Sequence, residues 1–174
     1  ADLSNVVALA AGADHALALR SDGTVVSWGN EYEPPAPVTN IIGIAAGNGH
    51  SLALRADGKV VAWGNNTSNK TNVPGSLANV VAIAAGDHHN LALKSDGTIT
   101  AWGDNTFGQR TVPAAATNVV AIAAGSAHSL ALKADGTVVV WGRNDSGQAT
   151  PPPFLTGVVG IAGGQYHSVA LVGD

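Results

Sequence analysis

The strongest constraint on the fold of this chain is a repeat that covers nearly all of its 174 residues. The unit reads NVVAIAAGxxHSLALKxDGTVVxWG, and successive copies of its histidine are separated by 35 residues and then three times by 39. A period of about 20 to 50 residues indicates neighbouring units that stack and bury a shared core. We therefore predict a single repeat domain with repeats at 5–39, 40–78, 79–117, 118–156 and a partial fifth at 157–174.

Each copy contains three short apolar runs with the composition of β-strands. Val, Ile and Thr dominate these runs, and helical periodicity is absent. Asp-Gly joins the second run to the third in every full copy, as at Asp57-Gly58. This dipeptide is typical of tight hairpin turns, so we expect the two strands to pair antiparallel. We also expect a short outer strand in connections such as 104–113, ended by Pro113. The predicted fold class is all-β.

A period near 39 residues with three or four antiparallel strands per unit fits a β-propeller with four full blades and a partial fifth. Ala45, Ala46 and Gly47 are small enough for an innermost strand at the propeller axis. We expect the tryptophan of each full copy to fill the space between blades; these residues are Trp28, Trp63, Trp102 and Trp141.

The string AAGxxHSLALKxDGTVVxWG, followed by NxxGQxTVP, resembles the repeat of the regulator of chromosome condensation family of β-propellers. The resemblance extends from Asn5 to Asp174. It places Gly, His, Leu, Asp-Gly and Trp-Gly at fixed offsets in four full copies and part of a fifth. WD-repeat propellers have a similar period, but every tryptophan here is followed by Gly and none by Asp.

Within that family, the short period and the connection Gly108–Pro113 are most similar to bacterial secreted members, which include a proteinaceous β-lactamase inhibitor. This resemblance implies a protein that is extracellular or on a bacterial cell surface, although a cytoplasmic location stays open. In that inhibitor, aromatic side chains at the two positions before the motif histidine form the binding surface. Here Tyr166 is the one Phe, Tyr or Trp at those positions, so we do not transfer the inhibitory activity.

The number of copies differs from that of known family members, which commonly close with seven blades and would need roughly 270 residues at this period. A fifth blade with two strands leaves an open sheet edge. Three interpretations follow: a segment of a longer propeller, a small ring, or an arc completed by a second chain. The absence of an initiator methionine favours the segment.

Composition and motifs argue against several functions. The formal net charge of −4 and the scattered Lys and Arg residues argue against nucleic acid as a partner. No apolar run approaches the roughly 18 residues that span a bilayer, so we expect no membrane insertion. We predict no catalytic activity, no cofactor and no metal site, because the motif histidines lie on separate blades and are expected to bond neighbouring backbone groups. These histidines are His15, His50, His89, His128 and His167.

The residues that vary between copies form the predicted functional surface. They lie before the motif histidine and after the tryptophan, and both positions fall on one face because each strand reversal changes ends. We predict a non-catalytic protein-binding module with these candidate partner-binding residues: Asp14, Tyr32, Asn48, Asp87, His88, Phe107, Arg110, Gln165 and Tyr166.

Two alternatives come from other functional classes. Carbohydrate or cell-surface binding would use repeated polar and aromatic sites, namely Asn65, Asn66, Asp104, Asn105 and Phe107. An architectural role would make the chain a repeat segment of a larger bacterial surface protein. Either kind of chain can form homo-oligomers through the open blade edge.

Overall fold

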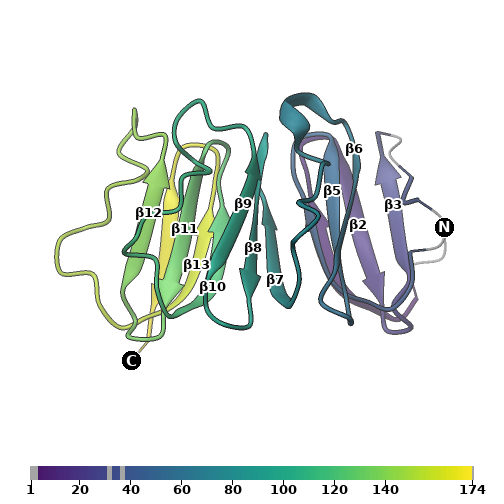
Figure 1. Cartoon of the computed structure of the whole chain (residues 1–174), viewed down its shortest axis with the longest axis horizontal. Coiled ribbons are helices and arrows are strands. Elements are labelled where there is room, and N and C mark those ends of the chain that lie inside the picture. Colours follow the sequence, from purple (N-terminus) through teal and green to yellow (C-terminus); the bar gives the residue numbers. More distant parts are fainter. Residues whose placement is uncertain (1–3, 31–32, 36–37, 174) are drawn as a thin grey trace.

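The computed structural model describes residues 4–30, 33–35 and 38–173, and it is built from antiparallel sheets with one 3₁₀ turn. We call the sheets blades 1 to 5 in chain order (Figure 1). Blades 1 to 4 have three strands each and blade 5 has two. The described chain contains no helix long and apolar enough to cross a membrane. The elements are β1 (Val6–Ala11), β2 (His15–Arg20), β3 (Val25–Gly29), β4 (Ile41–Ala46), β5 (His50–Arg55), β6 (Val60–Gly64), η1 (Thr67–Asn69), β7 (Val80–Ala85), β8 (His89–Lys94), β9 (Ile99–Gly103), β10 (Val119–Ala124), β11 (His128–Lys133), β12 (Val138–Gly142), β13 (Val158–Gly163) and β14 (Ser168–Val172).

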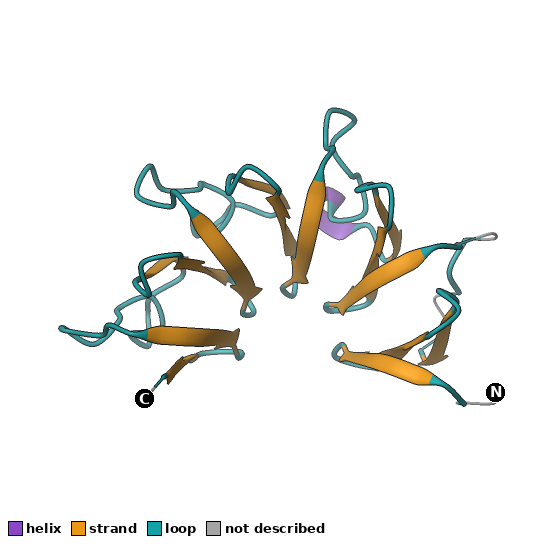
Figure 2. Cartoon of the chain, turned by 90° about the horizontal axis from the view of Figure 1, so that it is seen from below, coloured by secondary structure: helices purple, strands orange, loops and turns teal. Residues whose placement is uncertain are grey.

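The five blades radiate from a common axis as an arc that stays open between blade 1 and blade 5 (Figure 2). The first strands of successive blades contact one another. Space at the axis is tight, because a Cβ added to Gly47 would lie 2.2 Å from the Gly86 carbonyl oxygen. The all-β propeller architecture and the small residues of the inner strand are therefore as predicted. The described residues form an open arc and not a closed small ring.

The Asp-Gly hairpins form as predicted, with the second and third strands antiparallel in blades 1 to 4. The glycine alone of each pair has a positive φ, between 75° and 79°. The aspartate instead accepts a hydrogen bond from the backbone two residues later, as Asp96 Oδ1 does from the Thr98 N–H at 2.9 Å. At Asp135, hydrogen bonds from the Thr137 hydroxyl and from the Thr137 N–H lower the pKa of the carboxyl to about 2. Both members of the dipeptide thus stabilise the turn.

The predicted outer strand is wrong, because the described residues between the third strand of one blade and the first of the next contain no strand. Two side chains within 104–113 take the backbone bonds that a strand would need. Asn105 Oδ1 accepts the Arg110 N–H at 2.8 Å, and Asp104 Oδ1 accepts the Thr106 N–H at 3.3 Å. Asn and Asp compete for backbone groups in this way and favour turns over strands.

Three of the four tryptophans fill the space between blades. Trp63, Trp102 and Trp141 are 6%, 4% and 7% exposed and belong to clusters that also contain leucines of the preceding blade. Trp28 is 44% exposed, so the prediction is wrong for blade 1. Blade 1 lies at one end of the arc, and no described blade lies beyond it (Figure 2).

The motif histidines of blades 1 to 4 link successive blades. His89 Nε2 lies 2.9 Å from Ser129 Oγ in the next blade, and that hydroxyl donates to the Gln109 carbonyl oxygen at 2.9 Å. The Ser129 proton is thus used, so His89 Nε2–H is the donor to Ser129 Oγ. His50 repeats the arrangement with Asn90 Oδ1 at 2.7 Å. The predicted structural role is confirmed, but this partner is a side chain of the next blade rather than a backbone group.

Burial favours the neutral form of His50, His89 and His128. It lowers the pKa of His50 and of His89 to about 4, and it lowers the pKa of His128 as well. Among the described residues, no group of three or more His, Cys, Asp or Glu side chains is arranged to hold a metal ion.

Candidate partner-binding face

Two kinds of loop meet on one face of the arc, which we call the variable face. The histidine turns precede the motif histidines and comprise residues 12–14, 47–49, 86–88, 125–127 and 164–166. The outer connections follow the third strands. Backbone hydrogen bonds join the two, as from Asp104 N–H to the His88 carbonyl at 2.8 Å and from Arg143 N–H to the Ala127 carbonyl at 2.9 Å. The prediction that both loops share one face is confirmed.

The histidine turns surround a shallow central depression of about 390 Å³ at the axis. Three of the candidate residues line it: Asn48, Asp87 and Gln165. The rest of the lining is mostly Gly and Ala, so this part of the face offers few side chains for recognition.

The buried side chain of Lys70 connects two of these histidine turns. This side chain is among the largest fully buried ones, and its Nζ donates to the Asn48 carbonyl oxygen at 2.6 Å and the Asp87 carbonyl oxygen at 3.3 Å. Burial lowers the pKa of the ammonium group. The Asp87 carboxylate also accepts a hydrogen bond from Ser126 Oγ in the next turn. Asp87 is therefore partly a structural link, which its variability between copies did not indicate.

Two other candidates lie apart from this depression. Asp14 is exposed, and its carboxylate accepts a hydrogen bond from Asn30 Nδ2 at 2.9 Å, which lowers its pKa. His88 is exposed at the edge of its turn, beside the connection that begins at Asp104. Tyr32 lies outside the described residues.

The most prominent group on the variable face is a row of three side chains from blades 3, 4 and 5. The Arg143 guanidinium carbon lies 4.9 Å from the ring centre of Phe107 and 5.4 Å from that of Tyr166. Phe107 is 44% exposed and Tyr166 is 47% exposed. A hydrogen bond from Arg143 Nε to Asp145 at 2.7 Å raises the pKa of the guanidinium, which keeps its charge. Guanidinium over aromatic rings is a favourable cation–π arrangement.

The structure thus brings Phe107 and Tyr166 together through a residue outside the nine candidates. Arg143 occupies the repeat position held by Asp104 in blade 3 and Asn65 in blade 2. The change from an acidic or neutral residue to a basic one at this fixed repeat position is the sequence feature that could have identified Arg143. Arg110 is exposed in the same outer connection as Phe107, and its Nη1 donates to the Gly103 carbonyl oxygen at 3.3 Å.

The polar residues considered for carbohydrate binding are occupied within their own connections. Asn65 Oδ1 accepts the Thr67 N–H, and Asn66 Nδ2 donates to Asn72 Oδ1. Asp104 and Asn105 likewise bond within 104–111. Of the five residues, Phe107 offers an exposed side chain that none of these loop bonds occupies.

The repeat profile of the regulator of chromosome condensation (RCC1) repeat matches four segments that together make up more than half of the chain, residues 6–33, 41–69, 80–109 and 119–148. The chain belongs to this family. Comparison with curated proteins finds no match.

Several solved propellers are similar to the RCC1-repeat chain. Prp20p from Saccharomyces cerevisiae, whose crystal structure was described with its binding to Gsp1p and histones, has a TM-score of 0.79 at 25% identity, over 95% of this chain and 55% of Prp20p. Yeast RCC1 (Prp20) bound by Kap60 gives 0.78 at 29%, over 96% and 54%. The ectodomain of the Arabidopsis thaliana receptor kinase ACR4 gives 0.78 at 22%, over 97% and 68%. The chain spans about half the length of the two yeast structures.

Proposed function

We propose that this chain is a non-catalytic protein-binding module that contacts its partner through the variable face. The observation that carries the proposal is the row of Phe107, Arg143 and Tyr166. Aromatic residues and arginine dominate the binding hot spots of protein interfaces. Three blades supply one side chain each, so the row is held in place by the rigid scaffold and not by a single loop.

The relatives support the class of function. Prp20p was described with its binding to the proteins Gsp1p and histones, and yeast RCC1 was crystallised with Kap60. We carry over protein binding as a class and none of these partners, because the chain spans about half of those proteins.

We extend the proposal to an extracellular or cell-surface role in a bacterium, because Gly108–Pro113 resembles the connections of secreted members of the family. A secreted inhibitor is its narrowest form. Its support is that Phe107 joins Tyr166 at the exposed surface, which gives two aromatic side chains where the turn positions alone gave one.

The test compares two triple variants in affinity capture followed by quantitative mass spectrometry. The first replaces Phe107, Arg143 and Tyr166 by Ala. The control replaces exposed Ser21, Lys59 and Ser95 by Ala, which lie at the opposite, hairpin end of the blades.

We expect proteins captured by the wild type and the control to be lost with the first variant. Each hot-spot residue contributes about 2 kcal/mol or more, or about 30-fold in affinity. Capture of the same proteins at the same level by all three chains would refute the assignment of the face.

A further inference from the structure

The Asp-Gly hairpins and the starts of the first strands form the end of the blades opposite the variable face. Figure 1 shows the second strands running down to these hairpins and the third strands running back up. Backbone hydrogen bonds join the two parts, as from the Val119 N–H to the Gly97 carbonyl oxygen of the preceding blade at 3.3 Å. We call this end the hairpin face; it comprises residues 5–7, 20–24, 40–42, 55–59, 79–81, 94–98, 118–120, 133–137 and 157–159.

The second residue of every first strand is apolar and exposed on this face. In blades 2, 3 and 4, Ile42 is 60%, Val81 is 54% and Val120 is 56% exposed. Each of these three blades has a neighbour on both sides, so the exposure does not depend on which blades lie at the ends of the arc. Val7 and Val159 hold the same position in blades 1 and 5 and are also more than half exposed. We call these five residues the apolar arc.

A β-bulge turns these side chains out of the sheet. In blade 3, Val80 lies opposite Lys94 and Ala82 lies opposite Leu93, so Val81 has no partner in the ladder. The register skips the same position in the other four blades. The extra residue of a bulge bends the strand and re-aims its own side chain. Val80 is 4% exposed, so packing between the blades requires an apolar residue there and does not require one at Val81.

The apolar arc is nevertheless built from Val or Ile in all five copies. Figure 2 views the molecule from the hairpin face, and the first strands that carry the five residues follow one another around the axis. Together they expose roughly 300 Å² of apolar surface, since a whole side chain of this size exposes on the order of 100 Å². An apolar patch of this size on a soluble protein often marks an interaction surface.

The charges around the apolar arc are nearly balanced. The hairpin turns carry five cations and four carboxylates, namely Arg20, Arg55, Lys59, Lys94 and Lys133 against Asp22, Asp57, Asp96 and Asp135. The two signs alternate at short range, as at Lys133 Nζ and Asp135 Oδ2, which lie 3.0 Å apart. An anionic bilayer or a nucleic acid is attracted by a clear excess of cations. A face with alternating signs is instead complementary to a second copy of itself after a small rotation.

The dimensions of the hairpin face also suit a pair of copies. A standard interface buries about 800 Å² on each partner and has an apolar centre within a polar rim. The apolar arc supplies the centre, and the charged hairpin turns around it supply the rim. A contact between two identical faces needs a two-fold axis, which closes the assembly at two copies.

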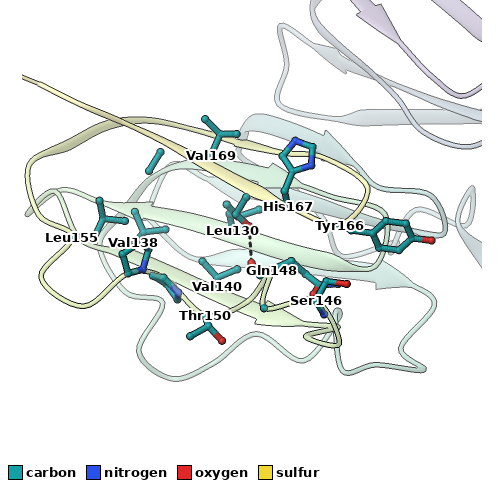
Figure 3. A pocket seen from close by; sticks show the side chains of 15 residues that line it. Leu130, Val138, Val140, Ser146, Gln148, Thr150, Leu155, Tyr166, His167 and Val169 are labelled. Atoms are coloured by element: carbon teal, nitrogen blue, oxygen red, sulfur yellow. Dashed lines mark hydrogen bonds between the residues drawn. The ribbon is translucent and has the colours of Figure 1, made fainter.

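We propose that two copies of this chain dock hairpin face to hairpin face, with their apolar arcs in contact and the cations of each copy facing the aspartates of the other. The two variable faces then point in opposite directions, so the dimer presents two partner sites at once. The contact is separate from the pocket of about 380 Å³ between blades 4 and 5, because no residue of the apolar arc lines that pocket (Figure 3).

Sedimentation equilibrium at protein concentrations up to about 0.5 mM tests this contact. The double variant Ile42→Glu with Val120→Glu places two carboxylates in the apolar arc. The matched control, Phe107→Glu with Tyr166→Glu, makes the same change at two exposed residues of the variable face. Circular dichroism checks that the sheets of each variant are intact.

We expect the wild type and the control to approach about 35 kDa, twice the 17.3 kDa of one chain, with at least tenfold weaker association of the arc variant. A wild type that stays monomeric throughout would overturn the proposal. Equal weakening in the two folded double variants would also overturn it. Because the control changes the row on the variable face, loss of partner binding and loss of the dimer are read out separately.

A cysteine placed at the middle of the apolar arc tests the geometry. The chain contains no cysteine, and Val81 of blade 3 lies at the centre of the arc, close to the two-fold axis of the proposed dimer. We expect Val81→Cys to form a disulfide-linked dimer at least tenfold faster under mild oxidation than Phe107→Cys, as measured on non-reducing gels. Equal rates would contradict the proposed contact.

Vesicles of phosphatidylcholine with phosphatidylglycerol test the alternative occupant, a lipid surface. We expect the wild type not to sediment with them. Sedimentation of a monomeric wild type with the vesicles, lost in the arc variant, would assign the apolar arc to lipid and overturn the proposal.

Discussion

The link between His89 and Ser129 provides a sharp test of how the blades are held together. Ser129→Ala removes a fully buried hydroxyl and leaves His89 Nε2–H without its acceptor at 2.9 Å. The Gln109 carbonyl oxygen keeps its second donor, Trp141 Nε1, at 2.9 Å. One unsatisfied buried donor costs about 1–3 kcal/mol. We therefore expect Ser129→Ala to lower the free energy of unfolding by about 2 kcal/mol, or the Tm by about 4–8 °C at this chain length.

Urea denaturation followed by tryptophan fluorescence measures this loss, and the repeat itself provides the control. Asn90 holds the position of Ser129 in blade 3, where its Oδ1 accepts from His50 at 2.7 Å and its Nδ2 donates to the Lys70 carbonyl oxygen at 2.7 Å. Ser129→Asn can make both bonds, so we expect it to lose less than half as much stability as Ser129→Ala. A Ser129→Ala protein within about 0.5 kcal/mol of the wild type would refute this reasoning, as would equal losses in the two variants.

Three further predictions follow from the same structure. The pKa values of His50 and His89 are about 4, below the ordinary histidine value of 6.5, so the unfolded chain takes up protons first as the pH falls. Stability is therefore fully present above about pH 6.5 and falls by up to about 1.4 kcal/mol per pH unit for each histidine as the pH drops towards 4. Urea titrations at pH 7, 6 and 5 measure this, and a constant free energy would contradict it. Lys70→Met removes the donor to two turn carbonyls and should cost about 1–3 kcal/mol in the same assay, whereas an unchanged midpoint would show that these bonds contribute nothing. Gly47→Ala should prevent folding or cost several kcal/mol, because the new Cβ would lie 2.2 Å from a backbone oxygen. Gly43→Ala has its nearest contact at 3.6 Å and should be neutral or stabilising by up to about 1 kcal/mol. Circular dichroism and thermal melts compare the two variants, and equal behaviour would refute the packing argument.

Local signals were sufficient to predict much of the fold. The Asp-Gly turns, the three strands of each full copy and the small inner strand all follow from residue types at neighbouring positions, repeated at a fixed period. A further local signal lies at the residue that precedes the first strand of each copy. Asn5, Asn40, Asn79 and Asn118 have positive φ values of 53–58° just before the first strand, and Gly157 takes this place in blade 5 with a φ of 66°. Asn and Gly are the residues that tolerate this conformation best.

Contacts between blades were not predictable from these local signals. The exposure of Trp28 depends on which blades are present beside blade 1 and not on its own repeat. The bridge from Phe107 through Arg143 to Tyr166 joins three different copies, and no spacing within a copy indicates it. The position after the motif histidine did hold a clue, since it is polar in copies 2 to 5, as at Ser51 and Asn90, within an otherwise apolar strand.

The way each histidine turn is held explains why its residues can vary. In blade 2, the Gly47 N–H donates to the His50 carbonyl oxygen at 2.9 Å, and the His50 ring bonds the next blade. The backbone of the turn is therefore fixed from both ends, and the Asn48 side chain is exposed without being needed for the fold. Asp87 differs from Asn48, because its carboxylate bonds Ser126 in the neighbouring turn. Variation between copies identifies where a binding surface can be built on this scaffold, and the contacts between blades decide which of those side chains remain free to bind.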